Sequence, residues 1–282
     1  MTDLAPIIAR MQTTARTVRL PLRSQTWRGM SGSWTGAGTG SSIDFQDHRN
    51  YLPGDDPRYI DWLAYARSGH YTMKLYREEV SPLVDLALDV STSMFLDAPK
   101  TNRTLELFHF ALASALHARA SVRCYLVGGG EVKALAPDAA LAGEMPTQVN
   151  DNAPPALERI PWRAGSLRVW ICDLLFEQNP ALHPLALAKG RGVVLAPWCR
   201  AEGDPAWRGN VELLHCETAE KRNQRVTPTL LTAYKEAYTR HFALWREHAR
   251  TLGIAFARVP AEPDFMDAIC LEALPNGVVE MV

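Results

Sequence analysis

The chain has 282 residues, of which 47% are hydrophobic, so it can form a large packed core and is not intrinsically disordered. Lys and Arg total 30 against 31 for Asp and Glu, a net charge of -1 that gives no general attraction to nucleic acid or to an anionic membrane. We therefore expect no nucleic-acid partner, and expect any partner to be recognised at a local site.

Two further features bear on location. The N-terminal segment carries Asp3 and Arg10 where a signal peptide needs a longer apolar stretch, and no run approaches the roughly 18 apolar residues of a membrane span. The five cysteines are scattered and form no C-x-x-C pair, which favours reduced thiols. The sequence predicts a cytoplasmic protein without a membrane span.

The first elements are a helix and a loop. Apolar Ile7, Ile8 and Met11 predict a helix over residues 4–20, and the Gly- and Ser-rich stretch 24–42 predicts a loop. The fragment G-A-G-T-G-S in that stretch has no preceding strand and no P-loop lysine, so we do not interpret it as a phosphate-binding site.

Residues 43–79 combine turn signals with many charges. Pro53 and Gly54 predict a turn, Asp56 a helix N-cap, and Gly69 the end of a short helix that precedes a strand beginning near Tyr71. Aromatic residues are interleaved with the charges, so we expect a partly buried ion-pair network rather than a solvated surface. Its candidate residues, with a structural or partner-binding role, are Asp55, Asp56, Arg58, Asp61 and Arg67, together with Asp47 and Arg49.

The stretch L-V-D-L-A-L-D-V-S-T-S-M around residues 83–94 is the most informative part of the chain. Its apolar run predicts a buried strand that ends at Asp89, and Ser91 and Ser93 follow directly. These side chains are hard oxygen donors of the kind that bind Mg²⁺ or Mn²⁺. The alternative is that Ser91 and Ser93 only form a turn and a helix N-cap.

The remaining sequence alternates between predicted strands and helices. Strands are expected at 122–127, 132–135, 167–173, 192–197, 211–215 and 254–259, and helices at 101–119, 180–189, 230–252 and 264–274. The helix at 230–252 carries an apolar and aromatic stripe that we expect to pack on a sheet. The pattern predicts an α/β fold with a doubly wound, mostly parallel, Rossmann-like sheet.

A second carboxylate is placed by this topology. Asp173 follows the predicted strand at 167–173, and ligands of doubly wound sheets bind at carboxyl strand ends where the strand order reverses. Asp89 and Asp173 are therefore expected to face one crevice, although Asp173 can instead cap the residues after it. Asp97 is either a support for this site or, in our preferred interpretation, a helix cap.

The segment F-Q-D-H-R-N-Y-L-P-G-D-D-P-R-Y-I-D-W-L-A-Y-A-R, followed by L-D-V-S-T-S-M, resembles the bacterial family called domain of unknown function 58. The resemblance implies an N-terminal helical and extended arm, residues 1–80, and a von Willebrand factor type A-like domain, residues 81–282. It further implies a metal-ion-dependent adhesion site (MIDAS). Ser91 and Ser93 would ligate Mg²⁺ (or Mn²⁺) directly, Asp89 mainly through water, and Asp173 would lie on a further loop.

The resemblance also implies a partner. In the adhesion site one open metal position accepts an acidic side chain, and relatives of this family are often associated with MoxR-type AAA+ ATPases. A threonine ligand is also part of the pattern, but Thr147 lacks the usual neighbouring glycine and is a weak candidate. We expect a non-enzymatic protein interaction module, an adaptor or chaperone-like partner of such an ATPase.

Two other functions stay open from the sequence. A metal-free structural scaffold is favoured by the missing threonine ligand. A metal-dependent hydrolase or phosphotransferase with Asp89 as nucleophile or metal ligand is less favoured, because Ser91 stands where such a site needs a second Asp and no G-x-S-x-G motif is present.

Overall fold

The computed structural model describes residues 4–22, 31–39, 45–128, 130–144, 154–176 and 181–282. Contacts divide the chain into two compact units, one of Met1–Leu22 with Leu83–Val282 and one of Arg23–Pro82. This differs from the predicted division into 1–80 and 81–282. The reason is that helix α1 (Ala5–Thr14) buries Ile7 and Met11 and packs against α3 of the larger unit.

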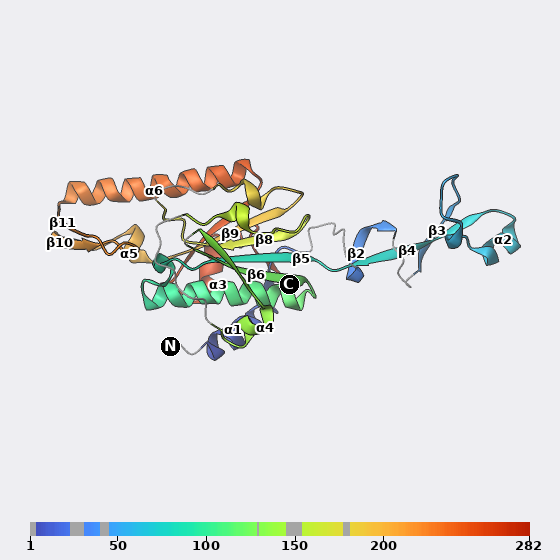
Figure 1. The fold of residues 1–282 in the computed structure, drawn as a ribbon, viewed down its shortest axis with the longest axis horizontal. Coiled ribbons are helices and arrows are strands. Elements are labelled where there is room, and N and C mark those ends of the chain that lie inside the picture. The colour runs from blue at the N-terminus through green and yellow to red at the C-terminus, as the bar shows by residue number, and fades with distance from the viewer. Residues whose placement is uncertain (1–3, 23–30, 40–44, 129, 145–153, 177–180) are drawn as a thin grey trace. The chain divides into compact units, whose positions relative to one another are not determined.

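The larger unit contains a six-stranded sheet in the order β12-β9-β8-β5-β6-β7 (Figure 1). Its strands are β5 (Leu83–Asp89), β6 (Ser121–Gly128), β7 (Glu131–Leu135), β8 (Leu167–Ile171), β9 (Arg191–Trp198) and β12 (Ala255–Pro260). Neighbouring strands are parallel except for β6 and β7, which are antiparallel at one edge. The predicted α/β class with a mostly parallel sheet is confirmed.

The strand order reverses at β5. From β5 the chain forms β6 on one side, and later returns to form β8 on the other side. The segments after β5 and β8 therefore leave the sheet at the point where ligands bind in doubly wound folds. Residues 84–89 are all buried, as the uninterrupted apolar run predicts for a strand covered on both faces.

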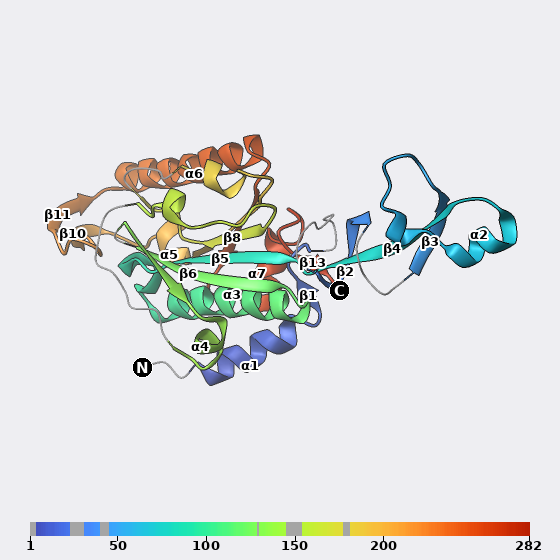
Figure 2. The ribbon, with the colours of Figure 1, turned by 45° about the vertical axis from the view of Figure 1, so that its right-hand side comes forward.

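Helices cover both faces of this sheet, with α3 on one face and α6 on the other (Figures 1 and 2). Phe242, Trp245 and Ala249 of α6 pack in the core on their side of the sheet. The predicted stripe is only partly buried, because Leu231 and Tyr234 lie in the more exposed N-terminal half of α6. The helices of this unit, besides α1, are α3 (Ala98–His117), α4 (Pro137–Leu141), α5 (Arg200–Gly203), α6 (Pro228–Thr251) and α7 (Phe265–Leu271).

Short elements complete the larger unit. They are the antiparallel hairpin β10 (Gly209–Leu214) and β11 (Lys221–Val226), the pair β1 (Val18–Arg19) and β13 (Glu280–Met281), and the 3-10 turns η2 (Thr92–Phe95), η3 (Leu157–Arg159) and η4 (His183–Leu185). The predicted helix at 180–189 is wrong for residues 181–189. Only η4 forms there, and Ala188 and Lys189 both adopt left-handed backbone angles that end any helix.

The smaller unit is a three-stranded antiparallel sheet in the order β2-β4-β3, with a short helix. Its elements are β2 (Ser31–Thr39), β3 (Phe45–Asn50), η1 (Pro57–Tyr59), α2 (Trp62–Ser68) and β4 (Thr72–Val80). The predicted loop at 24–42 is therefore wrong for residues 31–39. That segment forms a strand because it pairs with the distant β4, a long-range contact that its Gly- and Ser-rich composition does not indicate.

Candidate metal and partner-binding site

Two buried carboxylates lie at the carboxyl ends of the central strands. Asp89 is the last residue of β5 and is 0% exposed, and Asp173, two residues after β8, is 1% exposed. One carboxylate oxygen of each and the Cys172 sulfur all lie within 4.8 Å of one another. The prediction that the strand topology brings Asp89 and Asp173 together is therefore confirmed.

Both oxygens of Asp89 accept hydrogen bonds. The backbone N–H of Ser91 donates to Oδ1 at 2.9 Å, and the Cys172 thiol donates to Oδ2 at 3.1 Å. Burial raises the pKa of Asp89 to about 7, and the nearby Asp173 carboxylate adds to this effect. The charge on Asp89 is thus poorly compensated, as expected where a cation can bind.

Asp173 is paired with a buried lysine. Lys100, from the first turn of α3, is 0% exposed, and its Nζ lies 2.7 Å from Asp173 Oδ2 and 2.5 Å from Glu202 Oε1. Burial alone would lower the pKa of Lys100, but Asp173 and Glu202 outweigh burial and raise it. The backbone N–H of Leu175 donates to Asp173 Oδ1 at 3.1 Å.

The two serines lie at the start of η2. Ser91 Oγ and Ser93 Oγ are 3.1 Å apart, and Ser91 is buried while Ser93 is half-buried. Ser91 is the N-cap residue of η2 by position, but its side chain makes no capping hydrogen bond. The turn and the N-cap position expected in the alternative are present at Ser91, but without a side-chain capping bond, and the two hydroxyls face each other.

A fourth carboxylate reaches this segment from the turn between β10 and β11. Glu217 accepts the Ser93 N–H on Oε1 at 2.9 Å and the Thr92 N–H on Oε2 at 3.3 Å. Glu217 was not predicted, because 124 residues separate it from Ser93 and no local motif surrounds it. Lys100 and Glu202 were missed for the same reason.

Two further predictions concern Asp97 and Thr147. The Asp97 side chain accepts the Lys100 N–H at 2.8 Å and caps α3, so the preferred interpretation as a helix cap is confirmed. Thr147 lies outside the described residues.

Asp55 and Asp56 each pair with an arginine of the smaller unit. Arg49 donates two hydrogen bonds to Asp55, at 2.6 and 2.7 Å, and the bond from Arg49 lowers the pKa of Asp55. Asp56 caps η1 and binds the Arg58 guanidinium, which lowers the pKa of Asp56. The predicted cap at Asp56 and both ion pairs are confirmed, but the Asp56–Arg58 pair is exposed, so the expected partial burial does not hold there.

Asp61 has a similar structural role. It is 8% exposed, caps α2 through the N–H groups of Leu63 and Ala64, and accepts a hydrogen bond from His48 at 2.8 Å. The His48 bond is the main cause of its lowered pKa. Arg67 is exposed near the end of α2 and has no ion pair among the side chains that the structure describes.

The family described as "Protein of unknown function DUF58" matches residues 47–243, which include the charged turn, both strand ends and the β10–β11 hairpin. The chain belongs to this family. No curated protein matches this DUF58 chain. A solved structure, the conserved hypothetical protein BatB from Bacteroides thetaiotaomicron, is similar with 14% identity and a TM-score of 0.33, over 70% of this chain and 98% of that one. That similarity is too low to support an argument about fold or function.

Among the described residues of this DUF58 protein, no helix combines the length and the apolar sequence needed to cross a membrane. The strand-end donors, by contrast, match a hard cation in type. Adjacent oxygen ligands of an octahedral Mg²⁺ with bonds of about 2.1 Å lie about 3 Å apart, and the two serine hydroxyls are 3.1 Å apart.

The charges at the site also match a cation. The carboxylates of Asp173 and Glu202 share the ammonium of Lys100, while Asp89 has no ion pair among the described residues, so negative charge is in excess at this buried place. A divalent ion next to Asp89 would compensate that excess. Lys100 is also a competitor, because its ammonium already occupies one oxygen of Asp173.

Proposed function

We propose that this DUF58 protein is a non-enzymatic interaction module, with a von Willebrand factor type A-like domain whose strand-end site binds Mg²⁺ or Mn²⁺ and receives an acidic side chain of a partner. The observation that carries the proposal is that Asp89 and Asp173 meet at the reversal of strand order, with the paired hydroxyls of Ser91 and Ser93 directly after Asp89. The resemblance noted from the sequence makes a MoxR-type AAA+ ATPase the proposed partner.

The site residues would have different roles in binding the ion. Ser91 and Ser93 would supply neutral oxygen ligands, and Asp89 and Asp173 would supply negative charge. The bound ion would supply a positive charge that bridges these carboxylates to one from the partner. Such a contact is directional, and it adds specificity to a larger protein interface.

The chemistry of the nearest groups supports a binding role over a catalytic one. The Ser91 hydroxyl pairs with that of Ser93 and with the Asp89 carboxylate, and no histidine is among the hydrogen-bond partners that the structure describes for these two serines. Burial raises the pKa of Cys172 well above its usual value, so its thiol is a poor nucleophile at neutral pH. A hydrolase with Asp89 as nucleophile remains the least supported alternative.

A metal-free scaffold is the second candidate, and the Lys100 ion pairs favour it. The Lys100 ammonium lies 2.7 Å from Asp173 and already compensates the charge of that carboxylate. A metal ion bound to Asp173 would compete with it. On this alternative, Asp89 and Asp173 only help to hold α3 and the loops against the sheet.

Calorimetric titration of Mg²⁺ and Mn²⁺ distinguishes the two candidates. We expect saturable binding to the wild-type protein, its loss in Asp89→Ala and Ser93→Ala, and wild-type binding in Ser68→Ala, which removes an exposed serine of α2. Binding that is unchanged in Ser93→Ala, or absent up to millimolar metal, would favour the scaffold.

A pull-down with a purified MoxR-type ATPase then tests the partner. The proposal predicts binding that is lost with EDTA and in Asp89→Ala. Binding that is unchanged by EDTA and by Asp89→Ala would refute the metal-assisted contact.

A further inference from the structure

The turn between β10 and β11 places a carboxylate of the chain itself on the candidate site. Glu217 binds the backbone N–H groups of Ser93 and Thr92, both within the D-x-S-x-S segment. In the proposed function, an acidic side chain of a partner approaches this same segment. The chain therefore already contains a group of the chemistry that the site is proposed to receive.

The turn holds Glu217 in this position by its own hydrogen bonds. His215 Nδ1 accepts the N–H groups of Glu217 and Thr218 at 3.3 and 3.2 Å, and the His215 N–H donates to the carbonyl of Glu220 at 2.9 Å. Ala219 adopts a left-handed backbone angle, φ 58°, that closes the turn. The Glu217 side chain is thus presented by an ordered turn.

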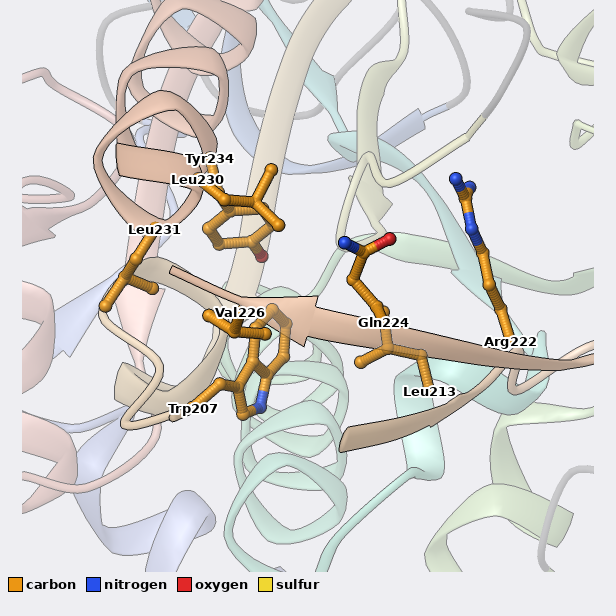
Figure 3. Close-up of a pocket in the computed structure, with 8 residues that line it drawn as sticks. All are labelled: Trp207, Leu213, Arg222, Gln224, Val226, Leu230, Leu231 and Tyr234. Atoms are coloured by element: carbon orange, nitrogen blue, oxygen red, sulfur yellow. The ribbon is translucent and has the colours of Figure 1, made fainter. Parts of the chain in front are cut away.

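The rest of the hairpin is loosely attached to the larger unit. Most residues of β10 and β11 are exposed, and the last residue of β11, Val226, is the buried one. A pocket of about 220 Å³ separates the hairpin from the start of α6, lined by Trp207, Val226, Leu230 and Tyr234 among others (Figure 3). Few apolar contacts would have to break for the hairpin to move.

We propose that the β10–β11 hairpin is a latch, in which Glu217 covers the D-x-S-x-S segment and must leave when an acidic side chain of the partner binds. The inference rests on the proposed function for the identity of the incoming group. It adds that binding is an exchange of one carboxylate for another, so the free protein is held in a closed state. Removing Glu217 then strengthens binding by removing the competitor.

Amide exchange measured by NMR tests the closed state without metal. A hydrogen bond to a charged acceptor protects its N–H, so in Glu217→Ala we expect the amides of Thr92 and Ser93 to exchange about tenfold faster or more. Glu212→Ala is the matched control, because Glu212 is an exposed carboxylate of the same hairpin that pairs with Lys221. Equal exchange in both variants would overturn the latch. Glu217→Gln, which retains an acceptor oxygen, should lie between them.

Competition by a carboxylate probe tests the exchange itself. N-acetylglutamate N-methylamide, titrated in Mg²⁺, should shift the amide signals of Thr92 and Ser93 at about tenfold lower concentration in Glu217→Ala than in wild type or Glu212→Ala. If the three proteins need the same probe concentration for these shifts, the latch proposal is overturned. If the tenfold difference persists without Mg²⁺, the latch stands and the cation site of the proposed function fails.

Discussion

Replacing Lys100 by methionine tests how the buried charges are balanced. The substitution keeps a long side chain but removes the ammonium that lies 2.7 Å from Asp173 and 2.5 Å from Glu202. Lys100 and Asp173 are 0% and 1% exposed, and removing one member of a buried ion pair costs about 3–5 kcal/mol. Each kcal/mol lowers the melting temperature of a unit of roughly 200 residues by about 2–4 °C, so we expect a fall of about 6–20 °C.

Thermal and urea unfolding in EDTA at neutral pH give this measurement, with Lys235→Met as the matched control. Lys235 pairs with Asp204 at the surface, where both side chains are about half exposed (42% and 51%), and such a pair is worth less than about 1 kcal/mol. A loss in Lys100→Met no larger than in Lys235→Met would refute the buried ion pair.

Adding Mg²⁺ to the same two variants extends the test to the proposed cation. An ion that binds the folded state stabilises it, and Lys100→Met removes the competing ammonium while leaving Asp89, Asp173 and Glu202 in place. We therefore expect Mg²⁺ to raise the melting temperature of Lys100→Met more than that of the wild type. An increase that is equal or absent would favour the metal-free scaffold.

Three further predictions depend on how far a side chain is buried. Burial lowers the pKa of His109 to about 4, so the folded protein keeps this side chain neutral. The unfolded chain takes up a proton on it below about pH 6.5. The free energy of unfolding therefore falls as the pH is lowered from about 6.5 to about 4. Between about pH 7 and pH 5 the wild type should lose about 2 kcal/mol that His109→Leu does not lose, as measured by urea unfolding at both pH values. Asp85 is 0% exposed and accepts hydrogen bonds from Arg163 at 2.7 and 2.9 Å, so Asp85→Ala should lose about 3–5 kcal/mol in urea unfolding; a loss below about 1 kcal/mol would contradict the buried pair. Exposed Cys270 should react rapidly with a maleimide at neutral pH while buried Cys172 stays unmodified in the folded protein, as mass spectrometry of the labelled peptides would measure.

Most strands of the larger unit could be predicted because buried parallel strands have a strong local signature. The runs at 83–89 and 192–197 are almost continuously apolar, and each is a strand in the structure. The strand at 31–39 lacks that signature, since its residues are mostly Gly, Ser and Thr and it depends on pairing with β4. Local sequence does not encode a partner that lies about forty residues away.

The residues of the candidate site also fall into those that the sequence predicts and those that it does not. Asp89 and Asp173 could be predicted to meet because the strand topology alone brings carboxyl ends together. Lys100, Glu202 and Glu217 could not, because charged side chains in helices and short turns normally point to solvent. Their positions depend on how α3, α5 and the hairpin pack around the strand ends, which no local pattern in the sequence indicates.

The three missed residues change how the site is expected to work. With the Lys100 ammonium already on Asp173, an incoming cation gains less from that carboxylate than in an open site, which argues for weak cation binding by the free protein. A carboxylate of a partner would be a further negatively charged ligand of the ion, so cation and partner should strengthen each other's binding by the same factor. Glu217 holds a carboxylate of the chain on the Thr92 and Ser93 N–H groups, and in the latch proposal its release accompanies the arrival of the partner's carboxylate.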